Sequence, residues 1–158
     1  MSKISFFIVF SLMLNCLHSQ SFNEDKTSFS NFLKRMYLSS PFEGVKIVDD
    51  YNHQYLVSVI SIEKAKYSSE SVMNRVAQVK AQSQASTFIN GANISMDMVI
   101  TTRETKDSSN KSLSNITETV ESIKQNAVGF SKGLEFLINF ESTDKQKMIF
   151  VYIRSMKV

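Results

Sequence analysis

The sequence has few of the residues that small proteins use as covalent or metal staples. Its 158 residues include one cysteine, one proline, two histidines and no tryptophan. A single cysteine excludes a disulfide framework, and with so few thiol and imidazole ligands a structural zinc site is hard to build. No tryptophan is present to stack on a sugar ring, so glycan binding has no support. Stability must therefore come from packing of an apolar core.

Strong charge of either sign is also missing. The formal net charge is +3, and the basic residues form no run. Nucleic acid and anionic lipid are therefore not expected as partners on the ground of charge. The only long apolar run extends from Ile4 to Leu14. A bilayer-spanning helix needs roughly 20 residues, so a retained membrane anchor is disfavoured.

The N-terminus has the order of a secretory leader. Lys3 is followed by the apolar run and then by the polar residues Ser19 and Gln20. This order predicts a signal peptide over residues 1–19 that is removed on export, to a periplasm, a cell envelope or the medium. The alternative is a lipoprotein leader that keeps Cys16 as an acylated residue, and only this would place the chain on a membrane. Asn15 fits a lipidation site poorly, because a small residue usually precedes the cysteine.

Hydrophobic periodicity divides the rest of the chain into two parts, an N-terminal helix and turn over residues 20–44 and one domain over residues 45–158. Spacings of three and four predict helices, and alternation predicts strands. The expected helices are Thr27 to Leu38, Glu70 to Asn90 and Leu113 to Ala127, the last ended by Gly129. The expected strands form a hairpin of Val45 to Asp49 with Tyr55 to Glu63, a single strand over Ile94 to Thr102, and a hairpin of Leu134 to Phe140 with Met148 to Arg154.

These elements predict an α+β fold. Alternating strands suit a sheet that is buried on one face, rather than a doubly wound parallel sheet. We expect a two-layer sandwich, with a mostly antiparallel sheet of about five strands and two main helices on one face. The long helical connections leave room for one or two parallel strand pairs. Inward positions are assigned to Met73, Val76, Ala77, Ala81, Ala85 and Phe88 in the long helix, and to Leu134, Phe136, Ile138 and Phe140 in the last hairpin.

One stretch matches the G-x-S-x-G pattern of a serine hydrolase, with Ser131 as the serine between Gly129 and Gly133. That pattern requires a strand before the serine and a helix after it. Here a helix precedes and a strand follows. His53 also lies before Ser131 in the chain, whereas that hydrolase class places its histidine after the nucleophile. We therefore interpret the glycines as a helix stop and assign no catalytic residue.

The other polar clusters also yield no site. Asp49, Asp50, Asn52 and His53 resemble a metal loop only in composition, because on the calcium-loop template Tyr55 takes the glycine position and Ser61 the glutamate position. A solvated turn is the preferred interpretation, and we assign no metal or cofactor. Asp97 falls on the polar side of its strand and is expected at the surface. Three glycosylation sequons begin at Asn93, Asn110 and Asn115.

Several small-residue and alternating segments together resemble a known family. They are Arg75-Val76-Ala77, Ala81, Ala85, Ile89-Asn90-Gly91, Ile94 to Thr102 and Met148 to Ile153. In their order of hairpin, helix, strand, helix and hairpin they are similar to the Lpp-twenty family of small bacterial envelope lipoproteins. That family's domain also resembles the N-terminal part of a flagellar assembly protein. The resemblance covers Val45 to Arg154 and implies an envelope location, but it brings no catalytic motif.

The sequence leaves three functions open. The leading one is a non-enzymatic exported module that binds another protein or itself, because the chain combines a leader, a complete core and no catalytic cluster. A small extracytoplasmic hydrolase would need a pocket built from residues distant in sequence. A carrier of an apolar small ligand would need an internal cavity.

Overall fold

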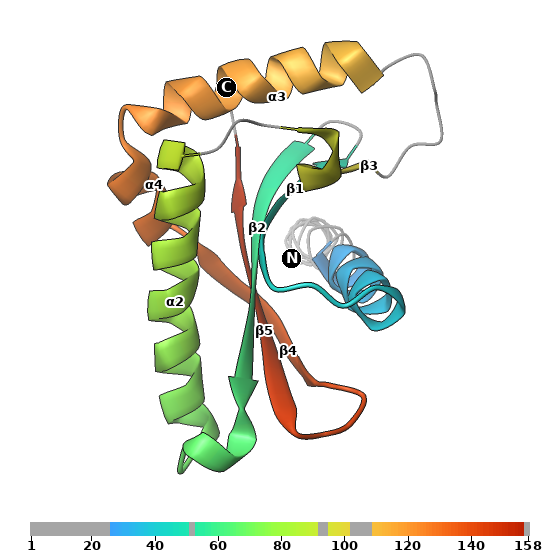
Figure 1. Cartoon of the computed structure of the whole chain (residues 1–158), viewed down its shortest axis with the longest axis vertical. Coiled ribbons are helices and arrows are strands. Elements are labelled where there is room, and N and C mark those ends of the chain that lie inside the picture. The colour runs from blue at the N-terminus through green and yellow to red at the C-terminus, as the bar shows by residue number, and fades with distance from the viewer. Residues whose placement is uncertain (1–25, 51–52, 92–94, 102–108, 157–158) are drawn as a thin grey trace, which may run out of the picture. The chain divides into compact units, whose positions relative to one another are not determined.

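The structure is a computed structural model that describes residues 26–50, 53–91, 95–101 and 109–156 (Figure 1). The chain divides into two compact units, with the boundary after Pro41. The predicted leader and Cys16 lie outside the described residues. In the first unit, residues 26–39 are helical, which confirms the helix expected from Thr27 to Leu38. The apolar spacing of this helix stacks the rings of Phe29 and Phe32, with centroids 6.5 Å apart.

The second unit is built on a five-stranded sheet with the strand order β3-β1-β2-β5-β4. The strands are β1 (Gly44–Asp50), β2 (His53–Glu63), β3 (Val99–Thr101), β4 (Glu135–Glu141) and β5 (Lys147–Ser155). Every pairing is antiparallel except that between β1 and β3, which is parallel. Both predicted hairpins and the predicted α+β class are therefore confirmed.

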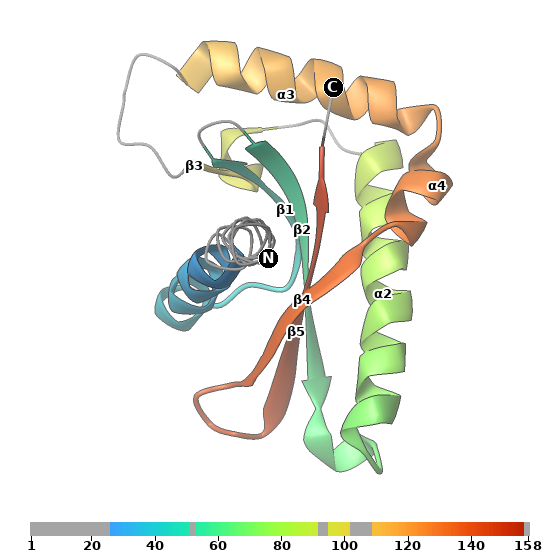
Figure 2. The same ribbon diagram turned by 180° about the vertical axis from the view of Figure 1, so that it is seen from behind.

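Helices cover one face of this sheet. They are α2 (Glu70–Gly91), α3 (Ser109–Lys124) and α4 (Ala127–Lys132), with short 3₁₀ turns η1 (Lys64–Lys66) and η2 (Met96–Met98). Figures 1 and 2 show α2 running alongside the strands, while α3 lies across one end of the sheet. None of the helices in the described ranges is long and apolar enough to cross a bilayer.

The helix α2 packs through small side chains. Ala77, Ala81 and Ala85 are completely buried, and Met73 and Ile89 extend the same stripe. Alanines at this spacing let the helix backbone lie close to the strands, so the packing needs few large side chains. The inner face predicted from the sequence is confirmed in its alanines, whereas Val76 and Phe88 are only half-buried at its margins.

The sheet is apolar on both of its faces. One set of buried strand residues belongs to the same core cluster as the helices and includes Ile47, Leu56, Ile60, Phe150 and Tyr152. Residues of the opposite face are buried as well, namely Val48, Val57, Val59, Ile149, Val151 and Ile153. The expectation of a sheet buried on one face is therefore wrong for β2 and β5. Residues 56–60 of β2 and 149–153 of β5 are buried at every position, as in strands that are buried on both faces.

The strand expected from Ile94 to Thr102 is much shorter in the structure, which describes residues 95–101 of that segment. Residues 96–98 form the turn η2, and only Val99–Thr101 pair with β1. The Ser95 hydroxyl donates to the Asp97 carboxylate, and the Met98 amide donates to the Ser95 carbonyl over 3.0 Å. These local bonds compete with strand pairing, which explains the error. Asp97 is exposed, as expected.

The third predicted helix ends earlier than its periodicity indicated. The helix α3 stops at Lys124, and α4 begins at Ala127, so Gly129 lies inside a second helix rather than ending the first. The break is due to Asn126, whose side chain accepts a hydrogen bond from the Gly129 amide over 3.1 Å. Asparagine is a favoured N-cap, so it starts a new helix where an apolar spacing alone predicts continuation.

The alternation predicted for the last hairpin is interrupted in β4. Phe136 pairs with Tyr152, but Ile138 pairs with Val151, so Leu137 is an extra residue that forms a bulge. Phe140, on the far side of the bulge, is 7% exposed, whereas Phe136 is 45% exposed. The bulge places these two phenylalanines on opposite faces of the sheet. The prediction that Phe136 is buried is therefore wrong.

Candidate functional site

Ser131 of the hydrolase-like pattern is a buried structural residue. It lies in α4, is 3% exposed, and its hydroxyl donates to the Val128 carbonyl over 3.1 Å. The glycines on either side have packing roles. A side chain at Gly129 would overlap the capping side chain of Asn126, and one at Gly133 would overlap the guanidinium of Arg154. The arrangement is a capped helix, not a nucleophile elbow.

His53 begins β2, opposite Asp50 in the strand register. Its exposed ring stacks beside that of Tyr55, with centroids 6.0 Å apart. In the described residues no contact joins His53 to Ser131. Asn52, the remaining polar residue of this turn, lies outside the described residues. In the described ranges no three His, Asp or Glu side chains are grouped closely enough to hold a metal ion.

The remaining predicted polar residues lie on separate elements. The hydrogen bond from Ser95 keeps the pKa of Asp97 below its usual value. The Lys46 ammonium donates to the Asp97 carbonyl oxygen over 2.9 Å and also lies over the Phe42 ring. Of the sequons, Asn110 and Asn115 lie in α3, and Asn93 is outside the described residues.

A pair of buried hydroxyl groups between α2 and the sheet was missed at the sequence level. Tyr152 and Ser58 face each other across β5 and β2. The Tyr152 hydroxyl lies 2.6 Å from Oδ1 and 3.0 Å from the carbonyl oxygen of Asn74. The Ser58 hydroxyl donates to Oε1 of Gln84 over 3.3 Å. Both hydroxyls thus bond to α2, and they fix the position of that helix on the strands.

The Tyr152 hydroxyl is not suited to proton transfer near neutral pH. Burial disfavours the phenolate and raises the pKa of Tyr152 to about 12. Its hydrogen-bond partner Asn74 carries an amide, which neither takes up nor releases a proton in this range. This pair could have been found from the sequence. The alternation along β2 and β5 places Ser58 and Tyr152 on the helix-covered face, where a hydroxyl needs a hydrogen-bond partner.

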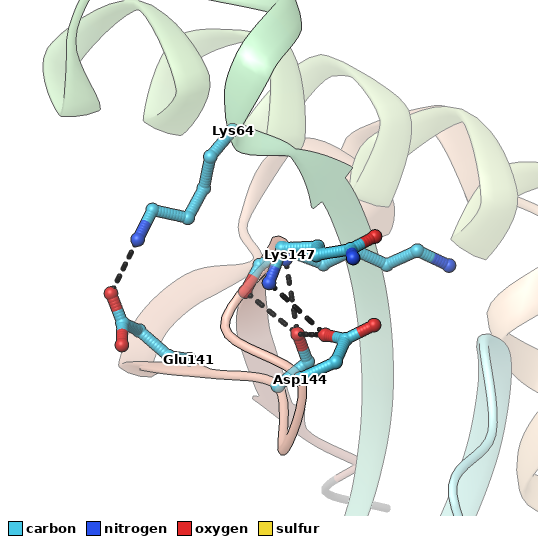
Figure 3. A network of polar contacts seen from close by, with 6 residues as sticks. Lys64, Glu141, Asp144 and Lys147 are labelled. Atoms are coloured by element: carbon cyan, nitrogen blue, oxygen red, sulfur yellow. Dashed lines mark hydrogen bonds and ion pairs between the residues drawn. The ribbon is translucent and has the colours of Figure 1, made fainter.

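A second polar network holds the turn between β4 and β5 (Figure 3). The Ser142 hydroxyl donates to Asp144 over 2.6 Å and accepts from the Lys147 amide over 3.0 Å. Lys64 of η1 forms an ion pair with Glu141, and its amide donates to the Gln146 carbonyl over 3.0 Å. These bonds lower the pKa values of Asp144 and Glu141. Because every member serves the turn or ties it to η1, we interpret the network as structural.

Aromatic side chains and an arginine gather where α4 meets the end of the sheet, and we call Phe130, Phe136, Tyr152 and Arg154 the aromatic corner. The rings of Phe136 and Tyr152 meet edge to face at 5.8 Å. Two residues further along β5, Arg154 lies over the Phe130 ring at 4.4 Å. Tyr152 and Arg154 point to the same face because side chains alternate along a strand.

The aromatic corner combines a fixed cation with exposed apolar surface. The Nη1 atom of Arg154 donates to the carbonyl oxygens of Gly129 and Phe130, so the guanidinium is held in place. Phe136 is 45% exposed. Large apolar side chains in contact with water are unfavourable by about 25 cal/mol per Å² relative to burial. The corner is therefore the candidate site for contact with another molecule.

Comparisons with known proteins add no further constraint. No family model, no curated protein and no solved structure matches the chain. The resemblance to the Lpp-twenty family stays a prediction.

Proposed function

We propose that the chain is an exported, non-enzymatic module that binds another protein through its aromatic corner. The observation that carries the proposal is the exposure of Phe136 beside Tyr152, with Arg154 two residues further along β5 over the Phe130 ring. Aromatic residues and arginine are over-represented in protein interfaces, where they supply most of the binding energy. Lysine and glutamate, which dominate ordinary surfaces, are depleted there.

The corner is also prepared for binding before a partner arrives. Stacking on Phe130 and two carbonyl acceptors hold Arg154 in one position. The Tyr152 hydroxyl is tied to Asn74, which fixes the ring against which Phe136 packs. Ordering a flexible side chain on binding costs about 0.5–1.5 kcal/mol, so these contacts reduce the cost of association.

A non-enzymatic role is supported by how the reactive groups are used. The Ser131 hydroxyl is buried and donates to the Val128 carbonyl. His53 stacks on Tyr55 at the start of β2. A nucleophile and its base need to lie within hydrogen-bond reach of each other, and no such contact joins these two in the described residues.

The proposal is tested by affinity capture from the envelope of the native host, with three versions of the chain as bait. Wild type and Val79→Ala, which removes an exposed apolar side chain of α2 outside the corner, should retain the same partner. Phe136→Ala should lose it, because truncation of a central aromatic contact costs about 2 kcal/mol, roughly thirtyfold in affinity. A partner that binds Phe136→Ala and wild type equally would contradict the proposal. Self-association that depends on Phe136 would show that the partner is a second copy.

Export forms the other part of the proposal and has its own test. The order of Lys3, the apolar run and Ser19 predicts that the mature chain begins at Gln20. N-terminal sequencing of the chain purified from its native host should therefore find Gln20. A lipoprotein would instead begin at an acylated Cys16. Intact Met1 on cytoplasmic material would contradict export.

A further inference from the structure

Arg154 of the aromatic corner uses only one of its three side-chain nitrogens in hydrogen bonds to the rest of the described chain. Its Nη1 atom donates to the carbonyl oxygens of Gly129 and Phe130. In the part of the chain that the structure describes, no hydrogen bond uses Nε or Nη2, and no carboxylate forms an ion pair with Arg154. Nε and Nη2 lie on one edge of the planar guanidinium, where their N–H groups match the two oxygens of a carboxylate. The guanidinium is therefore fixed by one edge and can bind an anion with another.

A second cation lies beside Arg154 in the fold. Lys132 is the exposed last residue of α4. It precedes Gly133, whose backbone lies so close to the guanidinium that a Cβ there would overlap Nη1. Neither cation is ion-paired within the described ranges. Glu135, the carboxylate nearest to Lys132 in the sequence, lies opposite Ile153 in the register, so it belongs to the other face of the sheet. The charge of the corner therefore favours an acidic partner.

Phe136 adds an apolar contact close to this cation. It pairs with Tyr152, and Arg154 follows Tyr152 by two positions on the same face of the sheet. Phe136 and Arg154 are thus diagonal neighbours, which lie roughly 7–8 Å apart in a sheet and within reach of long side chains. The Phe136 ring is largely exposed, as described above. A partner can therefore contact the ring and the guanidinium with two neighbouring side chains, one apolar and one acidic.

We infer that the partner of the aromatic corner presents an aspartate or glutamate side chain to Nε and Nη2 of Arg154, next to an apolar side chain that packs on Phe136. The inference rests on the proposed function, because it concerns the same surface. A C-terminal carboxylate would offer the same chemistry, but such termini are captured by backbone N–H groups. Here α4 directs carbonyl oxygens toward Arg154, those of Gly129 and Phe130. The corner therefore fits an acidic side chain.

Three short peptides test the inference on the purified chain. N-acetyl-Glu-Phe-amide carries the acidic side chain, and N-acetyl-Gln-Phe-amide replaces it with a neutral one. N-acetyl-Gln-Phe with a free C-terminus moves the carboxylate to the end of the peptide. In NMR titrations the first peptide should shift the Nε signal of Arg154 and the ring signals of Phe136. It should bind about fivefold more tightly than the other two, which is the contribution of a partly exposed ion pair.

Two variants of the chain locate the carboxylate. Arg154→Gln should abolish the preference for the glutamate peptide. Lys80→Gln removes an exposed cation of α2 outside the corner and changes the net charge by the same amount, so it should keep the preference. If Arg154→Gln alters the circular dichroism spectrum, the comparison of the three peptides on the wild-type chain decides by itself.

Three results would overturn the inference. They are equal binding of the glutamate and glutamine amides, stronger binding of the free C-terminus, and absence of a shift at Arg154 with the glutamate peptide. The proposed function is decided separately, by Phe136→Ala in the capture from the native envelope. Arg154→Gln as a further bait separates the two, because a partner that is lost with Phe136→Ala but kept in full with Arg154→Gln contradicts only the acidic contact.

Discussion

Gly133 and Arg154 are expected to be energetically coupled, and the sign of the effect of Gly133→Ala should depend on which residue occupies position 154. Gly133 has φ −87°, so alanine fits its backbone without strain. The difficulty is space, because the new Cβ would overlap Nη1 and Cζ of Arg154. The guanidinium would have to leave its place over Phe130 and release the carbonyl oxygens of Gly129 and Phe130.

The size of the effect follows from the contacts that are lost. A hydrogen bond from a charged donor contributes about 1.5–3 kcal/mol, and a partly exposed cation–π contact about 0.5–1 kcal/mol. The released arginine regains side-chain entropy of up to about 2 kcal/mol. Gly133→Ala should therefore destabilise the wild-type chain by about 2 kcal/mol. In an Arg154→Ala background the overlap is absent, and the same change should stabilise by about 0.5 kcal/mol through the entropy of the unfolded chain.

Urea unfolding of the four variants, followed by circular dichroism, measures this double-mutant cycle. The expected coupling energy is about 2.5 kcal/mol, well above the error of the method. Gly129→Ala in both backgrounds is the control, because its obstacle is Asn126 rather than Arg154. An equal cost of Gly133→Ala with and without Arg154 would refute the reasoning, since the clash would then lie elsewhere.

The remaining stability predictions concern the hydroxyl pair and the helix break. Tyr152→Phe removes the bond to Asn74 and should cost about 1 kcal/mol at neutral pH. Because burial raises the pKa of Tyr152 to about 12, the unfolded chain loses this proton near pH 10 while the folded chain keeps it. The stability that the protonated phenol contributes is complete below pH 10 and is lost as the pH rises toward 12. Between these two pH values, the free energy of unfolding of wild type should fall by roughly 2–3 kcal/mol more than that of Tyr152→Phe, as measured by urea titration. Equal losses would mean that the phenol is not buried. Asn126→Ala should cost about 1 kcal/mol through loss of the α4 cap. The exposed α3 residue Asn115, changed to Ala, serves as its control, and equal melting temperatures for the two variants would contradict the capping role.

Local pattern was sufficient to predict most elements of this fold. The alanine stripe of α2 repeats every three or four residues, and the apolar residues of both hairpins repeat every second residue. These spacings follow directly from helix and strand geometry. These features are encoded within short stretches, so they can be read without knowledge of distant contacts. The long helical connections left room for one or two parallel strand pairs without naming them, and the described sheet has one such pair, β3 with β1.

The errors arose where side chains compete with the backbone. The Ser95–Asp97 contact replaced strand by turn, and Asn126 divided one apolar periodicity between two helices. A hydrophobic pattern carries no information about such capping bonds, because the residues that form them are polar and lie outside the apolar stripe. Ser95, Asp97 and Asn126 are visible in the sequence. Whether they interrupt an element depends on whether their side-chain hydrogen bonds or the backbone hydrogen bonds of the strand or helix are the more stable.

By itself the sequence determined the fold class and both hairpins of the sheet. Tertiary structure alone decided that the aromatic corner exists, since Phe130, Phe136 and Arg154 come from three elements brought together by the packing of α4 and the pairing of β4 with β5. It also decided which side of the sheet Phe136 faces. Both depend on contacts between residues far apart in the chain, and a period of two or of 3.6 does not specify such contacts.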